Sequence, residues 1–487
     1  MMINSYCSDK YQYTMAKTFV DKGLDKTMAI FNMFYRTAPD NNNWAVVSGI
    51  NEVLEMIEGF GTQPESFFRK FLPGENYADF CRMITTVRFT GDMYAMEEGQ
   101  IAFPRQPLIT VVAPLLEAQI LETPMLCIMN HQMAVATKAS RVTRSTTKPV
   151  SEFGSRRAHG PWAALHGAKA AYTAGCVSTS NILATTEFDI TSTGTMAHSY
   201  VTAFGCSVRK EYDAFDAYIK SHRGEGIILL LDTYDTLKSG LPNALKAFKA
   251  NGIDDSYQPF YGIRLDSGDL AYLSRKCRET MDREGFTKCI IFASNSLDEY
   301  LISDLERQNA AIDSYGVGDA IATSKHNPCF GNVYKMVQIG DTPVLKLSED
   351  KAKVINPGFQ ITYRIYQENE SKADVTCLRS DSLACAIEEG KEILLVDEND
   401  QTRKTIYREG SYTAEKLQHK VMENGKRIRP DTTQQEKREK YLYELSRMNP
   451  TERRIINPHY HKVDISDDLY DLKMKLIYTI KEELNHV

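Results

Sequence analysis

Between residues 226 and 340 the sequence repeats one pattern, in which a short apolar run is followed by polar residues and then by an amphipathic stretch. The first repeat starts with "GIILLLDTYD", whose run of β-forming residues ends at Asp232. The stretch after it places Leu241, Leu245 and Phe248 on one helical face. Repeats of about 20 to 35 residues of this kind predict parallel βα units, which assemble into a doubly wound sheet or a barrel.

The second repeat, "YGIRLDSGDLAYLSRKCRETMDREG", has the same form. Its strand is predicted to end near Leu265, Asp269 is positioned to cap the following helix, and Gly285 ends that helix. The apolar stripe of this helix consists of Leu270, Leu273, Cys277 and Met281. Two further repeats begin with "CIIFASNSLDEY" and "AIDSYGVGDAIAT".

Polar residues follow the predicted strands of all four repeats. Because the carboxyl ends of parallel strands gather on one face, where ligands bind, these residues are expected to meet in one pocket. They are Asp232, Arg264, Asp266, Asn295 and Gly318.

The whole chain has 487 residues, which allows roughly three domains. The segments on either side of the repeats do not continue the βα pattern. Residues 1–135 mix helical stretches such as "GINEVLEMIEGF" with strand-like ones and predict an N-terminal α/β domain. Residues 136–350 would form the α/β barrel with the active site. Residues 351–487 are more charged and predict a C-terminal extension that packs on the barrel and the N-terminal domain. It would contain a strand pair in "KEILLVDENDQTRKTIYREG" and an exposed helix in "TTQQEKREKYLYELSRM".

Composition excludes several classes of partner. The net charge of −6 provides no broad basic surface, so a nucleic-acid partner is not expected, although a local basic cleft could hold small phosphates. The ten cysteines include no C-x-x-C pair, so neither a structural zinc site nor a disulfide framework is indicated. No apolar run reaches 18 residues and no secretory signal is evident, so we expect no membrane partner and a cytoplasmic location.

The motif "GIRLDSGDL" allows two interpretations. Arg264 and Asp266 could form a surface ion pair, with Asp269 only capping a helix. Alternatively, the carboxylates accept hydrogen bonds from sugar hydroxyls or bind Mg²⁺ through water, while the guanidinium binds a carboxylate or a phosphate.

Two other kinds of motif also allow either a structural or a functional interpretation. In "SEFGSRRAHGP", Arg156 and Arg157 are either solvated or bind an anion, with Phe153 offering a face to a flat ring. The turns in "SYGVGDAIATS" and "FASNS" are either ordinary tight turns or backbone cradles for a phosphate.

His198, in "TSTGTMAHSYV", has four possible roles: metal ligand, general base, packing residue or nucleophile. Metal binding is poorly supported, because no second histidine or cysteine lies beside it at ligand spacing. A neutral imidazole is a competent nucleophile towards a phosphoryl group.

Taken in order, these motifs resemble the nicotinate phosphoribosyltransferases of NAD biosynthesis, in their longer form. The resemblance runs from "SDKYQYTM" through "FPRQPL", "SEFGSRRAHGP", "STSN", "GTMAHSYV", "DTYDTL", "RLDSGDL", "SNSLDE", "YGVGDAIAT" and "GNVYKMV" to "LKLSEDKAKVINPG" and "NPHYHKVDIS". It implies an irregular α/β barrel of the type II phosphoribosyltransferase kind, with an N-terminal α/β domain and a C-terminal extension. It also implies a homodimer whose active sites lie at the subunit interface.

The resemblance implies a reaction between nicotinate and 5-phosphoribosyl 1-diphosphate, giving nicotinate mononucleotide and diphosphate. Mg²⁺ (or Mn²⁺) and ATP, as co-substrate, would take part. Asp266 and Asp269 would then hold ribose hydroxyls or the metal. The 5-phosphate would be bound by Gly316, Gly318 and Thr323, with Ser294 and Asn295 nearby.

At the other end of the site, Arg156 and Arg264 would bind the nicotinate carboxylate or the diphosphate. Phe153 and a Tyr11 from the second subunit would sandwich the ring, and Thr195 would lie against it. In this family the histidine that corresponds to His198 accepts the γ-phosphoryl group of ATP.

Ser180 and Asn181 lie where relatives that use nicotinamide carry an acidic residue. A neutral site beside arginines should favour a carboxylate, and hence nicotinate. One departure is Asp319, since the family's glycine loop often has threonine after its second glycine. The alternatives are a nicotinamide phosphoribosyltransferase, a catalytically silent nucleotide sensor and a generic sugar-phosphate barrel enzyme.

Overall fold

The computed structural model describes residues 5–61, 63–348, 353–398, 400 and 402–486. Residue contacts divide the chain into two compact units, of which unit 1 comprises residues 1–134 and 329–487 and unit 2 comprises residues 135–328. The predicted division into three domains stays a prediction. The motif "LKLSEDKAKVINPG" includes residues 349–352, which lie outside the described residues.

Unit 2 is built on a six-stranded parallel sheet in the order β7-β6-β11-β10-β9-β8. Its strands are β6 (Val150–Glu152), β7 (Ser178–Thr179), β8 (Ile227–Leu230), β9 (Tyr261–Leu265), β10 (Ile290–Ser294) and β11 (Ser314–Val317). All six strands are two to five residues long, and β8, β9, β10 and β11 are rich in buried apolar side chains, as expected for strands covered by helices on crossover connections. The predicted parallel βα units are thereby confirmed.

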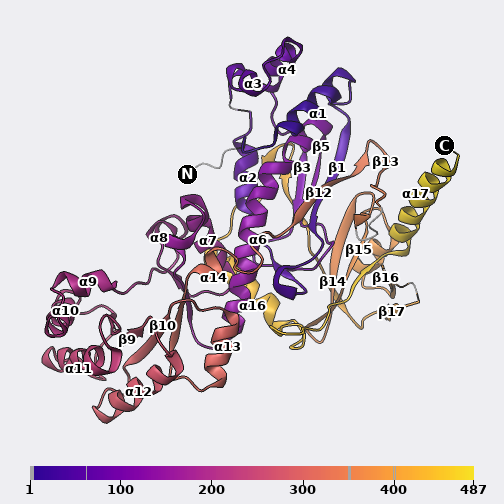
Figure 1. Cartoon of the computed structure of the whole chain (residues 1–487). Helices are drawn as coiled ribbons and strands as arrows, with labels where there is room; N and C mark the ends of the chain where they lie inside the picture. Colours follow the sequence, from indigo (N-terminus) through magenta and orange to yellow (C-terminus); the bar gives the residue numbers. More distant parts are fainter. Residues whose placement is uncertain (1–4, 62, 349–352, 399, 401, 487) are drawn as a thin grey trace. The chain divides into compact units, whose positions relative to one another are not determined.

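The helices of unit 2 follow its strands along the chain, and Figure 1 shows α11 and α12 beside β9 and β10. They are α7 (Pro161–Thr173), α8 (Ile182–Phe188), α9 (His198–Ala203), α10 (Val208–Ser221), α11 (Leu241–Ala250), α12 (Leu270–Arg283), α13 (Glu299–Arg307) and α14 (Asp319–Ala322). The predicted apolar stripes are buried at Leu241, Leu245, Phe248, Leu270, Cys277 and Met281. Asp269 caps α12 as predicted, because its Oδ1 accepts the Tyr272 N–H at 2.9 Å.

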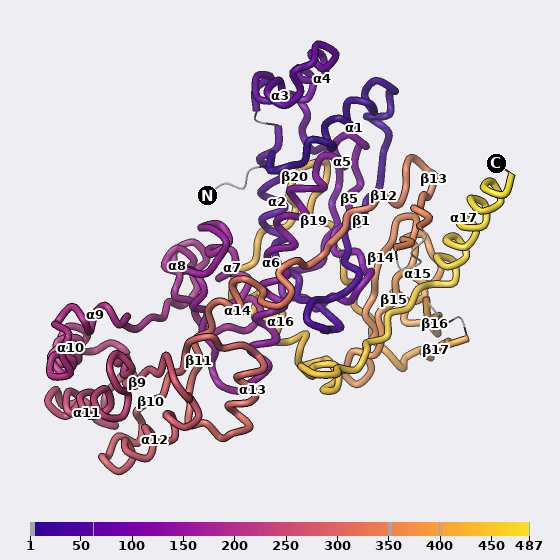
Figure 2. Tube along the Cα trace, in the orientation of Figure 1, coloured from indigo at the N-terminus to yellow at the C-terminus, as the bar shows by residue number. Residues whose placement is uncertain are grey.

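Unit 1 contains a seven-stranded antiparallel sheet in the order β13-β12-β1-β5-β3-β19-β20. Its strands are β1 (Met28–Tyr35), β3 (Asp92–Ala95), β5 (Ile109–Pro114), β12 (Asn332–Ile339), β13 (Thr342–Pro343), β19 (His419–Glu423) and β20 (Lys426–Arg427). Figure 2 shows how segments from distant parts of the chain meet in this sheet. The βα series therefore ends at α14, because β12 pairs with β1 and does not continue the parallel sheet.

A second sheet of unit 1 has six strands in the order β17-β16-β21-β15-β14-β18. They are β14 (Gln360–Gln367), β15 (Glu370–Leu378), β16 (Ile393–Asp397), β17 (Lys404–Tyr407), β18 (Thr413–Lys416) and β21 (Val463–Ile465). The predicted strand pair is confirmed as β16 and β17. A small antiparallel pair consists of β2 (Ala45–Val46) and β4 (Ile101–Ala102).

The helices that begin in unit 1 include those predicted near its start and at residues 432–448. They are α1 (Lys10–Asp21), α2 (Ile50–Glu58), α3 (Glu65–Phe71), α4 (Ala78–Ile84), α5 (Leu115–Ile120), α6 (Glu122–Arg144), α15 (Ser382–Glu388), α16 (Gln434–Ser446) and α17 (Asp467–Asn485). Helix α16 was expected to be exposed, yet it buries Lys437, Tyr441 and Glu444 on one face. Among the described helices, none is both long enough and apolar enough to cross a membrane.

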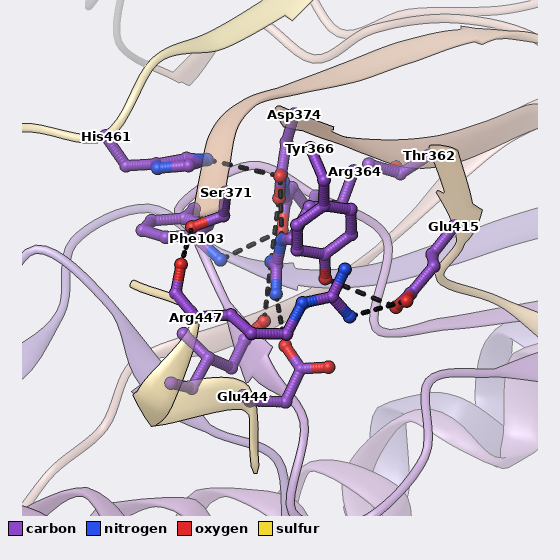
Figure 3. Close-up of polar contacts among 12 residues, drawn as sticks. Phe103, Thr362, Arg364, Tyr366, Ser371, Asp374, Glu415, Glu444, Arg447 and His461 are labelled. Atoms are coloured by element: carbon purple, nitrogen blue, oxygen red, sulfur yellow. Dashed lines mark hydrogen bonds and ion pairs between the residues drawn. The ribbon is translucent and has the colours of Figure 1, made fainter. Parts of the chain in front are cut away.

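A buried ionic network lies in unit 1 and is drawn in Figure 3. Arg364 donates to both carboxylate oxygens of Asp374 at 2.8 Å and to Glu444 at 2.6 Å, while His461 lies 3.2 Å from Asp374. Burial alone would raise the pKa of Asp374, but Arg364 and His461 hold it far below its ordinary value. Burial alone would lower the pKa of His461, but Asp374 and Glu452 raise it.

Candidate active site

A pocket of about 600 Å³ opens at the carboxyl ends of β6, β9, β10 and β11 in unit 2. Four of the five strand-end residues expected to converge line it: Arg264, Asp266, Asn295 and Gly318. The fifth, Asp232, lies beside the pocket. Other residues that were expected at the site also line it: Phe153, Arg156, Ser180, Thr195, His198, Ser294 and Gly316.

Arg264 is held in a fixed orientation by side chains from two strand ends and from the loop before α9. Its Nε donates to Ser294 Oγ at 2.8 Å, and its two terminal nitrogens donate to Thr195 Oγ1 at 2.9 Å and Asp266 Oδ1 at 2.8 Å. The Ser294 hydroxyl donates in turn to the same oxygen of Asp266. Because the side chains of Arg264 and Asp266 are only 14% and 20% exposed, they form a partly buried pair and not a surface ion pair.

The aromatic wall of the pocket is formed by Phe153. Its ring stacks on Phe292, with centroids 5.4 Å apart, and the Arg264 guanidinium lies 5.9 Å from its centroid. A Cβ on Gly316 would come within 2.8 Å of the Phe153 ring and 2.7 Å of Phe292, so this close approach requires glycine. The ring therefore presents a flat surface whose position is fixed from behind.

Two guanidinium groups at the same end of the pocket are available for a ligand. Arg156 and Arg157 line it and are exposed. Neither side chain forms a hydrogen bond or ion pair with any residue in the part of the chain that the structure describes. Together with Phe153, they can receive a planar, negatively charged molecule.

His198 begins α9, and its side chain is 43% exposed, so it is not a buried packing residue. Its Nδ1 lies 3.2 Å from the Thr233 hydroxyl. Its Nε2 faces two carboxylates, at 3.9 Å from Asp232 and 3.8 Å from Asp266. Within the described ranges, no group of three or more His, Cys, Asp or Glu side chains is arranged to hold a metal ion.

Three of the expected site residues are not among those that line the main pocket. Asp269 caps α12 and lines an adjoining pocket of about 300 Å³, which shares Ser294 and Asn295 with the main one. The Thr323 hydroxyl donates to the Asp319 carbonyl at 2.8 Å and does not line the main pocket. Tyr11 lies on α1 in unit 1 and is 48% exposed. Their roles in binding stay predictions.

Several lining residues were not identified from the sequence: Ser155, Gly194, Met196, Ala197, Leu230 and Ser296. Ser296 follows Asn295, and both have positive φ angles, of 50° and 80°. The "SNS" turn carried a signal for this conformation, because asparagine and serine are frequent in tight turns. Thr233 was also missed, although it directly follows Asp232.

Comparisons with known proteins agree along nearly the whole chain. Family models match residues 7–130 (nicotinate phosphoribosyltransferase N-terminal domain), 149–373 (nicotinate phosphoribosyltransferase family) and 359–473 (nicotinate phosphoribosyltransferase C-terminal domain). A nicotinate phosphoribosyltransferase of Bacillus subtilis is 36% identical over 495 residues, covering 98% of this chain and 96% of that protein. One from Dictyostelium discoideum is 31% identical and covers 95% of this chain and 86% of its own.

Among solved structures, human nicotinic acid phosphoribosyltransferase matches with a TM-score of 0.83 at 26% identity, over 96% of this chain and 99% of that chain. The predicted class is thereby confirmed: an irregular α/β barrel of the type II phosphoribosyltransferase kind, with an N-terminal α/β domain and a C-terminal extension. Since relatives above 30% identity align over nearly its full length and the three family models follow one another along it, the chain belongs to the nicotinate phosphoribosyltransferase family.

Proposed function

We propose that this protein transfers the 5-phosphoribosyl group of 5-phosphoribosyl 1-diphosphate to nicotinate, forming nicotinate mononucleotide for NAD biosynthesis. The pyridine nitrogen forms the new bond to C1 of the ribose, and diphosphate leaves with the electron pair of the broken C1–O bond. One observation carries this function: a single pocket combines the Phe153 face, the oriented pair of Arg264 and Asp266, and Arg156, whose side chain has no partner among the described residues.

These residues suit the chemistry of the step. Because the pyridine nitrogen already has a lone pair, no general base is required. The centre that needs stabilisation is a ribosyl carbon with cationic character, and Asp266 supplies negative charge in a partly buried setting. Arg156 and Arg264 would neutralise the nicotinate carboxylate or the departing diphosphate.

The oxygen atoms beside His198 fit a magnesium ion, as the family implies. Asp232 Oδ1 is buried and accepts no hydrogen bond from the residues described, and Asp266 Oδ2 faces the same imidazole. Mg²⁺ prefers such oxygen donors and usually binds through one or two carboxylates together with substrate phosphates. Bound there, the ion would neutralise charge on the diphosphate. Asp266 and Asp232 are better placed for this than Asp269, whose Oδ1 already caps α12.

Nicotinate is favoured over nicotinamide by the charges at the aromatic end. Ser180 lines the pocket, and the Asn181 side-chain oxygen is occupied by the N–H groups of Leu183 and Ala184. Ser180 and Asn181 are both neutral, whereas Arg156 and Arg157 line the pocket and are available to a carboxylate.

The same proposal includes ATP as co-substrate, His198 as its phosphoryl acceptor and a homodimer in the cytoplasm. The new bond joins phosphorus to an imidazole nitrogen, and ADP leaves with the bridging oxygen. A phosphate on His198 would add charge beside Asp232 and Asp266 and could organise magnesium and the diphosphate. Tyr11 of a second subunit would cover the face of nicotinate opposite Phe153.

To test the function, purified protein is incubated with 5-phosphoribosyl 1-diphosphate, Mg²⁺, ATP and either nicotinate or nicotinamide. We expect nicotinate mononucleotide as the principal product, detected by mass and by chromatography against a standard. Product from nicotinamide alone would identify a nicotinamide phosphoribosyltransferase. Stabilisation by these ligands without turnover would identify a silent nucleotide sensor.

Replacing His198 by asparagine is expected to preserve some ATP-independent transfer but to abolish the stimulation by ATP, because the amide cannot accept a phosphoryl group. Initial rates with and without ATP measure this effect. His326→Asn is the matched control, since His326 lies outside the pocket and its φ of 81° suits asparagine. Full ATP stimulation in the His198 variant would exclude the phosphoacceptor role.

A further inference from the structure

Glu152 is a buried carboxylate that sequence analysis did not identify. It is the last residue of β6, is 2% exposed and directly precedes Phe153. Its Oε1 accepts the N–H of Gly154, and its Oε2 accepts the Thr179 hydroxyl at 2.6 Å. One side chain is thus bonded to the loop that follows β6 and to the last residue of β7.

The contacts of Thr179 extend this connection along the pocket wall. Its hydroxyl oxygen accepts the Asn181 N–H at 3.0 Å, while the Ser180 N–H donates to the Glu152 carbonyl at 3.0 Å. The Thr179 carbonyl accepts the Thr193 N–H at 2.9 Å. The segment that leads to Thr195, a hydrogen-bond partner of Arg264, is therefore also attached to Thr179.

The packing around Gly154 leaves the Glu152 carboxylate little freedom to move. A Cβ on Gly154 would lie 2.7 Å from Glu152 Oε1, 2.7 Å from the Gly318 carbonyl and 2.4 Å from the Ala322 Cβ. The loop after β6, the glycine turn after β11 and this carboxylate are thus in direct contact. Gly154 therefore has to be glycine for the loop after β6 to lie this close to the carboxylate.

A carboxylate is chemically unusual here. Burial raises the pKa of Glu152, and its two hydrogen-bond donors, a backbone amide and a hydroxyl, are both neutral. A buried acid without a cationic partner is costly, so its presence needs a reason. Only a carboxylate offers two acceptor oxygens on one rigid group, whereas glutamine offers one acceptor and one donor.

We propose that Glu152 is a positioning residue for the aromatic end of the pocket. Its carboxylate fixes the spacing between the loop with Phe153 and Arg156 and the loop with Ser180, and so sets the affinity for the planar acid. This inference rests on the proposed function for the identity of the ligand, but not for the positioning itself.

Glu152→Gln tests the proposal with almost no change of shape. One of its two hydrogen bonds must be lost or reversed, so we expect the KM for nicotinate to rise by about tenfold. We expect kcat and the KM for 5-phosphoribosyl 1-diphosphate to change by less than about twofold. Thr179→Val, which removes the hydroxyl donor, should raise the KM for nicotinate to the same extent. Thr179→Ser, which keeps the hydroxyl, should have the KM of the unmodified protein.

Ser178→Ala is the matched control. The Ser178 hydroxyl donates to Ser151 Oγ at 2.8 Å and joins β6 to β7 one residue earlier, in equally buried surroundings. A purely structural role for Glu152 predicts similar losses in Ser178→Ala and Glu152→Gln. If both variants change the KM for nicotinate equally, the proposal is wrong.

Hydrogen exchange gives a measurement that does not depend on turnover. We expect the segments 153–157 and 179–184 to exchange faster in Glu152→Gln and Thr179→Val than in the unmodified protein, with no such change in Ser178→Ala. Unchanged exchange in both segments overturns the positioning role. Absence of nicotinate mononucleotide from the unmodified protein would instead overturn the proposed function, and the exchange measurement would still decide the role of Glu152. If Glu152→Gln does not fold, the two Thr179 variants provide the same comparison.

Discussion

Arg264→Ala is expected to lower kcat/KM for nicotinate mononucleotide formation by roughly 30- to 900-fold, which corresponds to about 2 to 4 kcal/mol of transition-state stabilisation. The Arg264 side chain is 14% exposed, and its guanidinium donates to Ser294, Thr195 and Asp266. Its removal deprives an anionic substrate group of its partner and also leaves the Asp266 carboxylate without its cation. Steady-state kinetics with both substrates varied measure the loss.

Two further variants make this result specific. Arg275→Ala removes an exposed guanidinium from the following helix, where it contacts only the Gln308 carbonyl at 3.0 Å among the hydrogen bonds described, and should leave kcat/KM unchanged. Arg264→Lys keeps the charge but loses the planar fork, so we expect it to recover only part of the activity. Unchanged kinetics in Arg264→Ala would exclude this residue from the site.

Local patterns in the sequence predicted local features of unit 2 correctly. The stripe of Leu270, Cys277 and Met281 is buried because an amphipathic helix can cover a sheet with only one face. Asp269 caps α12 because a side chain at that position reaches an N–H of the helix's own first turn. The convergence of Arg264 and Asn295 followed from the geometry of parallel strands.

Features that depend on pairing between distant segments could not be predicted in this way. The apolar run of β12 resembles another strand of the βα series, but its partner is β1, about 300 residues earlier. The Thr179 hydroxyl reaches the Glu152 carboxylate only because β6 and β7 pair in a register that places Glu152 opposite Thr179. The Thr323 hydroxyl donates to the carbonyl of Asp319, one turn earlier, a local contact that the sequence did not indicate, and its role at the phosphate stays a prediction.

The ionic network of unit 1 has no sequence signature either. Arg364 and Asp374 meet across the β14–β15 hairpin, whereas Glu444 comes from α16 and His461 from the segment before β21. Each residue alone has the appearance of an ordinary surface charge in a charged region of the chain. Only the fold shows that Arg364 and Asp374 are 1% and 0% exposed.

Asp374→Asn is therefore expected to lower the free energy of unfolding of unit 1 by about 3 to 5 kcal/mol. The amide keeps the shape but removes the charge that Arg364 and His461 face, and a buried cation without its partner is strongly destabilising. The fluorescence of Trp44 reports the unfolding of unit 1, because this side chain is fully buried and its indole N–H donates to the Glu452 carbonyl at 3.2 Å. Urea unfolding is followed by its fluorescence in a Trp162→Phe background, because the chain has only two tryptophans.

Lys372→Ala on the same strand is the matched control for this measurement. Lys372 pairs with Glu370 at 2.6 Å, but their side chains are 36% and 34% exposed. Solvent screens such a pair, so its loss should change the stability by less than about 1 kcal/mol. If Asp374→Asn unfolds at the same urea concentration as Lys372→Ala, the buried network does not stabilise unit 1. A large difference would show that desolvation makes the loss of one charge costly at Asp374 and not at Lys372.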